Sequence, residues 1–260
     1  MIIINLYEKI VRNRFLFEEL VKRDFNKRYK RTVLGILWSI ISPLILLLVL
    51  ATVFGTFFKH STPHYIPYLF CGNLVFSYYA ESTSMGMTAL VDNAAIFSKI
   101  NVPKYMFLLT KNVSSLINFG ITLILLFIFV AANHIDFTWK FLLLVYPVVC
   151  LVVFNLGVGL ILSAMYVFFR DTKYLYDIFK TMLMYFSAIF YTITSYPENL
   201  QKLFLLNPIY VYITYFRKII INDAVPSLGF HLLAFGYAAV ALLIGALIYK
   251  KQNFKFLYYI

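Results

Sequence analysis

Glu81 is the one acidic side chain in the strongly apolar segment 60–91, which contains no other Asp, Glu, Lys or Arg. An ionisable group in such a segment is costly to bury and is a functional candidate by default. The alternative is that Ser77, Ser82 or Thr83 and a neighbouring helix satisfy Glu81 in its protonated form. No second charge in the apolar segments offers a partner, which argues against a proton relay.

The residues needed for catalysis or metal binding are missing. None of the ten glycines is followed by lysine, so the chain lacks a phosphate-binding P-loop. There is no His-Glu-x-x-His and no cluster of Cys, His and acidic residues. We therefore predict no catalytic residue, no metal site and no cofactor bound by this chain. The histidines are expected near the ends of the apolar segments: His60, His64, His134 and His231.

Composition explains why a lone acid stands out. Of the 260 residues, 62% are hydrophobic, 19% aromatic and only 13% charged, against about 25% charged in an average soluble domain. This excludes a disordered chain, a nucleic-acid-binding globule and a disulfide scaffold. Cys71 and Cys150 lie in apolar segments and predict no disulfide. The sequence predicts a polytopic membrane protein.

Six apolar segments have the length of a membrane span, about 20 residues. They cover about 33–58, 65–87, 108–132, 141–169, 174–196 and 226–249. The apolar run within residues 197–222 is too short to cross a membrane, and Asn207-Pro208 interrupts it. We interpret residues 197–222 as a re-entrant helical hairpin, with a plain surface loop as the alternative. The predicted fold is an all-α membrane protein with six transmembrane helices, in which residues 33–260 form the transmembrane domain.

Residues 1–32 are predicted to form an amphipathic interfacial helix on the cytoplasmic side. Apolar residues recur on one stripe at Leu6, Ile10, Phe17, Val21 and Phe25, and basic residues lie largely off it. With both termini in the cytoplasm, eighteen of the 23 Lys and Arg fall on the inner side, as the positive-inside rule requires. The inner loop 88–105 is expected to contain a short helix with an apolar face. That face packs either on the chain itself or on a cytoplasmic partner.

The run from Lys27 to Trp38, KRYKRTVLGILW, resembles the start of the ABC-2 family of exporter permeases. Further segments agree in the same order along the chain: FCGN at 70–73, FRDT at 169–172, SAIFY at 187–191, and Asn207-Pro208. The likeness is greatest to the branch that exports O-antigen, capsule or teichoic acid. One departure is Thr192, where such permeases often place a proline.

The resemblance implies a homodimer in a bacterial inner membrane, together with two copies of a cytoplasmic ABC ATPase subunit. That partner, and not this chain, would bind ATP and Mg²⁺. The substrate would be a polyprenyl-linked polysaccharide moved out of the cytoplasm, with no role for nucleic acid.

The resemblance also assigns candidate site residues. Loop 88–105 becomes a coupling helix that docks on the ATPase, through Asp92, Asn93, Ile96, Phe97, Lys99, Ile100, Asn101 and Pro103. Residues 197–222 become an outer gate that includes Pro197, Asn207, Pro208, Tyr215 and Arg217. Because sugars stack on aromatic rings and hydrogen-bond to hydroxyls, the expected conduit residues are Trp38, Phe76, Tyr78, Tyr79, Glu81, Tyr185, Phe186, Phe190 and Tyr191. For each aromatic residue, lipid contact or core packing is the alternative.

Two other functions stay open from the sequence. One is an ABC-2 exporter of a small lipid or drug. The other is a multipass membrane enzyme that acts on lipid-linked sugars, against which the lack of a polar cluster at one depth argues.

Overall fold

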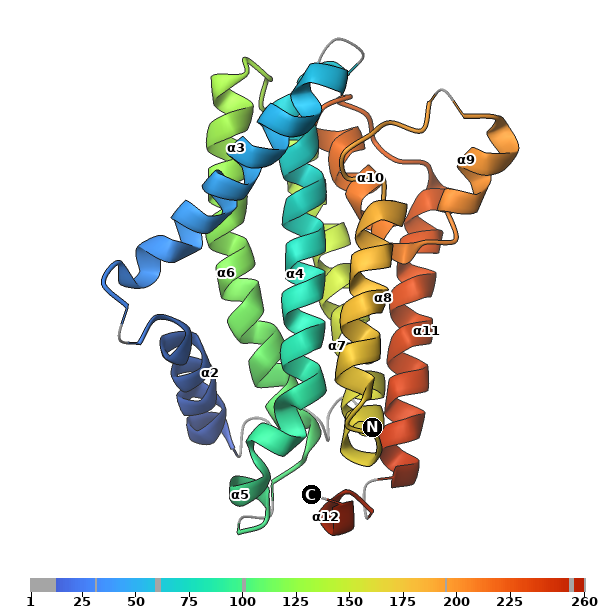
Figure 1. Cartoon of the computed structure of the whole chain (residues 1–260). Helices are drawn as coiled ribbons and strands as arrows, with labels where there is room; N and C mark the ends of the chain where they lie inside the picture. Colours follow the sequence, from blue (N-terminus) through green and yellow to red (C-terminus); the bar gives the residue numbers. More distant parts are fainter. Residues whose placement is uncertain are drawn as a thin grey trace.

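The computed structural model describes residues 13–30, 32–58, 62–99, 102–194, 196–252 and 255–259, and these contain helices and no strands. Long helices run roughly side by side as a bundle, with α2, α5 and α12 at one end and α9 and α10 at the other (Figure 1). These are called the α5 end and the α9 end. The elements are α2 (Arg14–Tyr29), η1 (Gly35–Leu37), α3 (Trp38–Phe58), α4 (Tyr65–Asp92), α5 (Ala94–Phe97), α6 (Tyr105–Ala132), η2 (Trp139–Leu144), α7 (Val145–Phe168), α8 (Thr172–Phe186), α9 (Glu198–Phe204), α10 (Pro208–Ile220), α11 (Leu228–Gln252) and α12 (Phe256–Tyr259).

Within the described residues, four helical segments are long and apolar enough to cross a membrane: Gly35–Thr56, Tyr105–Ala132, Trp139–Phe168 and Leu228–Gln252. They coincide with four of the six predicted spans. The other two predicted spans correspond to α4 and α8. Helix α4 has 28 residues but a more polar sequence, and α8 has only 15.

Two boundaries differ from the sequence prediction. Helix α4 continues to Asp92, so the first residues of the predicted loop 88–105 are helical. The predicted span 174–196 ends as a helix at Phe186, followed by irregular backbone with Ala188 at a φ of 49°. Side chains of other helices bind the carbonyl groups at this point, so the backbone does not need helical hydrogen bonds there.

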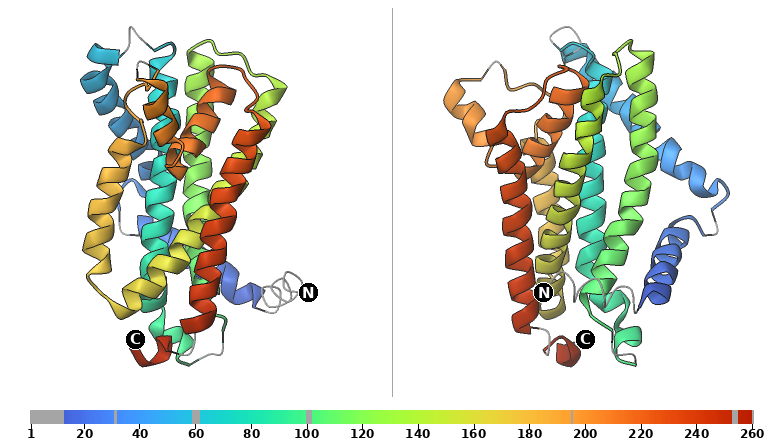
Figure 2. Two further views of the ribbon diagram at one scale, coloured as in Figure 1. Left: turned by 90° about the vertical axis from the view of Figure 1, so that its right-hand side faces the viewer. Right: turned by 180° about the vertical axis from the view of Figure 1, so that it is seen from behind.

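Glycines allow helices α7 and α11 to approach closely. A Cβ on Gly157 of α7 would lie 2.4 Å from the carbonyl carbon of Ala241 in α11, and one on Gly245 would lie 2.6 Å from the carbonyl oxygen of Gly157. Small residues at a helix contact let the two backbones pack closely. In a membrane the hydrophobic effect does not drive helices together, so this close packing is a main source of their association. Helices α4 and α7 lie in the middle of the bundle, and α11 packs along α7 at its side (Figure 2).

Helix α10 is buried at the α9 end rather than exposed as a surface loop. Its Tyr212, Tyr215 and Phe216 are completely buried in the same apolar core as α4, α6 and α7. By contrast, α3 slants away from α4 and α6 toward the α5 end (Figure 1). This slant opens the space in which the candidate site lies.

Candidate functional site

A polar cavity of about 380 Å³ lies between the slanting helix α3 and helices α4 and α6, with the end of α2 at its edge. Most of the residues that line it carry a hydroxyl, an amide or an aromatic ring, and Glu81 supplies a carboxylate. The lining residues are Tyr29, Thr32, Trp38, Ser39, Ser42, Pro43, Leu46, Asn73, Leu74, Ser77, Tyr78, Glu81, Ser115, Asn118, Phe119 and Thr122. A wall of this composition offers hydrogen bonds and stacking surfaces to a polyhydroxylated molecule.

A chain of hydrogen bonds connects four elements around this cavity. The Ser39 hydroxyl of α3 donates to the Tyr29 hydroxyl of α2, which in turn donates to Asn118 Oδ1 of α6 at 3.1 Å. Asn118 Nδ2 donates to Glu81 Oε2 of α4, also at 3.1 Å. Glu81 is half-buried and therefore interacts with a neighbouring helix through Asn118. A neighbouring helix thus supplies a partner for Glu81, and residue types alone do not single out Asn118 as that partner.

The structure brings together three of the predicted conduit residues. Trp38, Tyr78 and Glu81 line the polar cavity, and the Tyr78 hydroxyl donates to Asn112 Oδ1 at 2.7 Å. Phe76 and Tyr79 are instead buried in the core. Tyr79 also borders a second, apolar cavity of about 400 Å³ between α7 and α8.

The remaining conduit candidates lie on or after α8, away from the polar cavity. Tyr185 and Phe186 are more than half exposed at the end of α8. Phe190 is buried and stacks on Phe54 of α3 with the ring centroids 4.8 Å apart. Tyr191 is half-buried, and its hydroxyl donates to the carbonyl of Tyr185.

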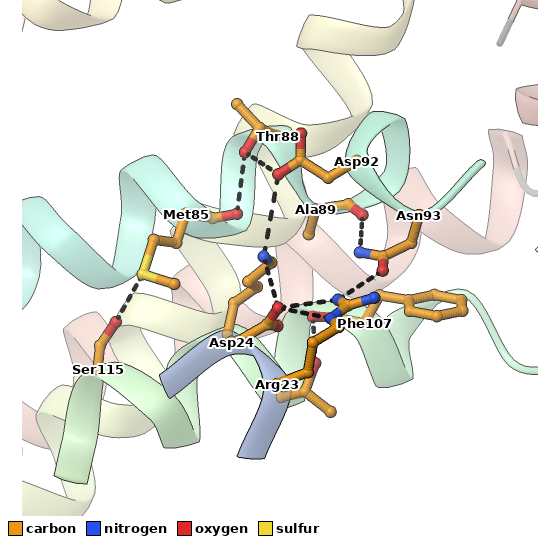
Figure 3. Close-up of polar contacts among 11 residues, drawn as sticks. Arg23, Asp24, Met85, Thr88, Ala89, Asp92, Asn93, Phe107 and Ser115 are labelled. Atoms are coloured by element: carbon orange, nitrogen blue, oxygen red, sulfur yellow. Dashed lines mark hydrogen bonds and ion pairs between the residues drawn. The ribbon is translucent and has the colours of Figure 1, made fainter. Parts of the chain in front are cut away.

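At the α5 end, charged side chains of α2, α4 and α6 meet in one network (Figure 3). Lys111 Nζ of α6 lies 3.2 Å from Asp24 Oδ1 of α2 and 3.9 Å from Asp92 Oδ2 at the end of α4. The side chains of Asp24 and Lys111 are only 1% and 6% exposed, so this ion pair is almost dry. Thr88 donates to the same oxygen of Asp92 at 2.9 Å.

A second contact joins α2 to the residue that precedes α5. Arg23 Nη2 donates to Asn93 Oδ1 and to Asp24 Oδ1, each at 2.8 Å. Asn93 Nδ2 donates to the carbonyl of Ala89 at 2.7 Å, which fixes the Asn93 side chain. The corner between α4 and α5 is therefore attached to α2 directly through Asn93, and through Asp92 by way of Lys111 of α6.

The predicted coupling residues fall at this corner and beyond it. Asp92 and Asn93 belong to the network, Ile96 is half-buried on α5, and Lys99 is exposed after it. Pro103 is half-buried before α6. The side chain of Phe97, and Ile100 and Asn101 as a whole, lie outside the described residues.

The other half of the network, Asp24 and Lys111, is not among the residues that the sequence singles out as site candidates. The available signal was the helical position of Asp24, which lies four residues after Leu20 on the buried face of α2. The predicted stripe residues Phe17, Val21 and Phe25 are half-buried beside that face, and Leu6 and Ile10 lie outside the described residues.

At the α9 end, Arg217 of α10 holds the irregular backbone after α8. Its guanidinium donates to the carbonyls of Ala188 and Ile189 at 2.9 Å each and to the carbonyl of Tyr68 at 3.3 Å. The guanidinium carbon also lies 3.4 Å from the centroid of the Tyr68 ring. Arg217 is 6% exposed. If α8 continued, the carbonyls of Ala188 and Ile189 would accept helical hydrogen bonds. Arg217 satisfies these carbonyls instead.

Other side chains complete this arrangement. Asn207 Oδ1 accepts from the backbone N–H groups of Ile209 and Tyr210 and so caps α10, while its Nδ2 donates to the Phe186 carbonyl. The hydroxyls of Tyr65 and Tyr68 donate to the carbonyls of Phe190 and Tyr191. Each polar contact replaces a helical hydrogen bond, as buried irregular backbone requires.

The other predicted gate residues lie before α9 or within α10. Pro197 is exposed before α9, and Pro208 is the first residue of α10. The buried Tyr215 bonds to His231 Nε2 of α11 at 2.7 Å.

Between α10 and α11, Asp223 accepts from Lys140 Nζ at 2.6 Å and from Thr138 at 2.8 Å. These hydrogen bonds, above all the one from Lys140, lower the pKa of the Asp223 carboxyl. Among the described residues, no three His, Cys, Asp or Glu side chains gather closely enough to hold a metal ion.

Comparison with known proteins identifies relatives along almost the whole chain. The family model "ABC-2 type transporter" matches residues 16–221. An O-antigen export system permease protein of Klebsiella pneumoniae is 25% identical over 93% of this chain and 95% of its own length. A protein of the same name from Myxococcus xanthus is 27% identical over 86% of this chain and 87% of its own. The polysialic acid transport protein KpsM of Escherichia coli is 24% identical over 91% and 93%.

Proposed function

This chain belongs to the ABC-2 type transporter family, and on that premise we propose that it is the permease subunit of an ATP-driven exporter of lipid-linked cell-surface polysaccharide. The observation that carries the proposal is the polar cavity between α3, α4 and α6. It offers hydroxyls, amides and aromatic faces inside a strongly apolar bundle. Relatives named for O-antigen and polysialic acid export, matched over most of their length, support the same substrate class.

The proposed topology has six spans, formed by α3, α4, α6, α7, α8 and α11, with α2 as a separate interfacial helix; residues 1–12 of the predicted segment 1–32 lie outside the described residues. Both termini and the α5 end face the cytoplasm, which agrees with the distribution of Lys and Arg. Helix α8 is about 22 Å long at 1.5 Å per residue, against a hydrocarbon core of about 30 Å. The irregular segment after it would complete the crossing, because the side chains of α4 and α10 satisfy its carbonyls.

Residues 197–222 then form a re-entrant hairpin in the outer leaflet. Cysteine labelling tests this topology. Cysteines at Asn207 and Asp223 should react with an impermeant maleimide added outside, and a cysteine at Asp171 should react only after the membrane is opened. Outside labelling at Asp171, or none at Asp223, would contradict six spans.

The proposed assembly is a homodimer with two ATPase subunits docked at the α5 end, and these subunits would bind ATP and Mg²⁺. Helices α3 and α8 carry many exposed apolar side chains, among them Leu48 and Phe179. We place the contact between the two copies on these helices. Cysteines scanned along α3 or α8 should crosslink between copies on one helical face, with a period near 3.6 residues.

Reconstitution tests the function itself. Proteoliposomes that contain the permease and its ATPase should move a fluorescent lipid-linked oligosaccharide only when ATP is present. The purified chain alone should neither hydrolyse ATP nor process the glycan. Transport restricted to a small lipid or drug would favour the second exporter type, and glycan turnover without the ATPase would favour a membrane enzyme.

A further inference from the structure

Helix α2 makes polar contacts with different parts of the bundle at two levels. At Arg23 and Asp24 it contacts Asn93 and Lys111, at the corner between α4 and α5. At its end, Tyr29 bonds to Ser39 of α3 and to Asn118, the partner of Glu81. Helices α4 and α6 also take part at both levels, through Asp92 and Glu81 and through Lys111 and Asn118, and α2 contacts α6 directly at each level and α4 by way of Lys111 and Asn118.

The connection between these two levels is short and continuous. Asp24 and Tyr29 are five residues apart in one unbroken helix, which corresponds to about 7.5 Å along its axis. Secondary structure of this length moves as a unit, so a displacement at Asp24 reaches Tyr29. Phe25 packs edge-on against Tyr29 with the ring centroids 5.3 Å apart and stiffens the same turn.

The Asp24–Lys111 pair is suited to carry displacement because it is buried. An exposed ion pair can exchange its partner for water at little cost. A nearly dry pair cannot, because separation leaves a charge without solvent or partner. Lys111 of α6 also lies within reach of Asp92. Its ammonium group therefore interacts with both Asp24 of α2 and Asp92 at the end of α4.

We propose that α2 transmits movement of the α4–α5 corner to the polar cavity and that Asp24, Lys111 and Tyr29 are the positioning residues for this coupling. The proposal rests on the proposed function, in which the ATPase docks at the α5 end. Displacement of the corner by ATP binding then moves α2 through Asn93, Asp92 and Lys111. Tyr29 passes the movement to the start of α3 and to the Asn118–Glu81 contact.

The test separates coupling from stability. Asp24→Leu with Lys111→Met replaces the ion pair by apolar side chains, a change that often preserves or increases stability. It should leave folding and ATPase binding intact but lower the glycan exported per ATP hydrolysed by roughly fivefold or more, the lower end of typical coupling effects. Lys111→Arg should retain most of the coupling. Glu18→Gln, which breaks only the exposed Arg14–Glu18 pair on the same helix, should change nothing.

Tyr29→Phe tests the other level without touching the ion pair. It removes the hydroxyl contacts to Ser39 and Asn118 and keeps the ring. We expect a similar loss of coupling. Added to the Asp24→Leu/Lys111→Met pair, it should cause little further loss, because both changes interrupt one path.

Trp38 provides a direct readout in the cavity. The chain has two tryptophans, so Trp139→Phe, combined with an ATPase whose tryptophans are replaced by phenylalanine, leaves Trp38 as the sole reporter. In this background, ATP added to the complex with the ATPase should change acrylamide quenching of Trp38 emission, and the apolar double variant should lose that change. Wild-type coupling and a wild-type ATP response in the double variant and in Tyr29→Phe would overturn the inference. If the parent protein neither binds an ATPase nor exports glycan with ATP, the proposed function fails and the inference fails with it.

Discussion

Replacement of Arg217 by methionine should destabilise the α9 end of the protein more than any other loss of a single charge there. The change keeps a long side chain but removes every donor. Two backbone carbonyls, those of Ala188 and Ile189, lose hydrogen bonds of 2.9 Å, and the stack on Tyr68 is lost as well. The site is buried, so water cannot easily replace the guanidinium.

The expected magnitude follows from these contacts. A buried acceptor left without a donor costs about 1–3 kcal/mol, so the two carbonyls together account for about 2–6 kcal/mol. Release of a buried guanidinium from its desolvation offsets part of this. We expect a net loss of about 2–4 kcal/mol in the free energy of unfolding, which corresponds to a fall in Tm of about 5–15 °C for a chain of this size.

The assay is thermal unfolding of the detergent-solubilised protein. Lys218→Met is the matched control, because it removes the same charge from the next residue of α10. The Lys218 ammonium lies 4.5 Å from the centroid of the Phe230 ring, an interaction of about 0.5–1 kcal/mol. Arg217→Lys should lie between the two, since an ammonium does not reproduce the forked geometry. The reasoning is refuted if Arg217→Met melts within about 2 °C of the wild type or no lower than Lys218→Met.

Three further predictions concern other parts of the molecule. Gly157→Ala should lower the free energy of unfolding by about 2 kcal/mol or more, because its Cβ would overlap the backbone of α11; thermal unfolding measures this. Glu81→Gln should reduce glycan export more than protein abundance, measured as surface glycan against immunoblot signal, because the cavity loses its carboxylate. The hydrogen bond from Lys140 lowers the pKa of the Asp223 carboxyl. The stabilising contribution of Asp223 is therefore fully present above the ordinary carboxyl pKa of 3.8 and disappears as pH falls through the lowered value. Asp223→Asn should reduce Tm at neutral pH and not in strong acid.

Each of these has a control or a contrary outcome. Gly236→Ala, whose Cβ would meet nothing within 4 Å, should stay within about 0.5 kcal/mol of wild type. Unchanged export by Glu81→Gln would show that the acid is merely tolerated. An Asp223→Asn effect that grows in acid would have the wrong sign for a lowered carboxyl pKa.

Much of the fold could be predicted from the sequence because hydropathy is a local property. A window of about 20 apolar residues indicates a span whatever its neighbours are, and four such segments recur in the structure. The family resemblance was also carried by local runs, the most specific at residues 27–38, and the comparisons confirm it. The short helix expected in loop 88–105 is present as α5.

The partners of the buried charges could not be predicted in the same way. Asp24 and Lys111 are 87 residues apart, and neither their residue types nor their spacing marks them as partners. Arg217 appeared only as a member of an outer gate, whereas its guanidinium binds carbonyls on two other segments. Backbone carbonyls carry no sequence signature, so nothing in the residue types around Ala188 shows that α8 ends at Phe186.

The class of protein, the approximate spans, the lone acid Glu81 and the lack of a P-loop can all be recognised in the sequence, because each depends on residues close together in the chain. The folded arrangement was needed to show that Glu81 meets Asn118, that Trp38 and Tyr78 share its cavity while Tyr185 does not, and that α2 contacts both the α4–α5 corner and this cavity. The physical reason is that burial makes an unpaired polar group costly but does not specify its partner. The packing of helices distant in sequence supplies that partner.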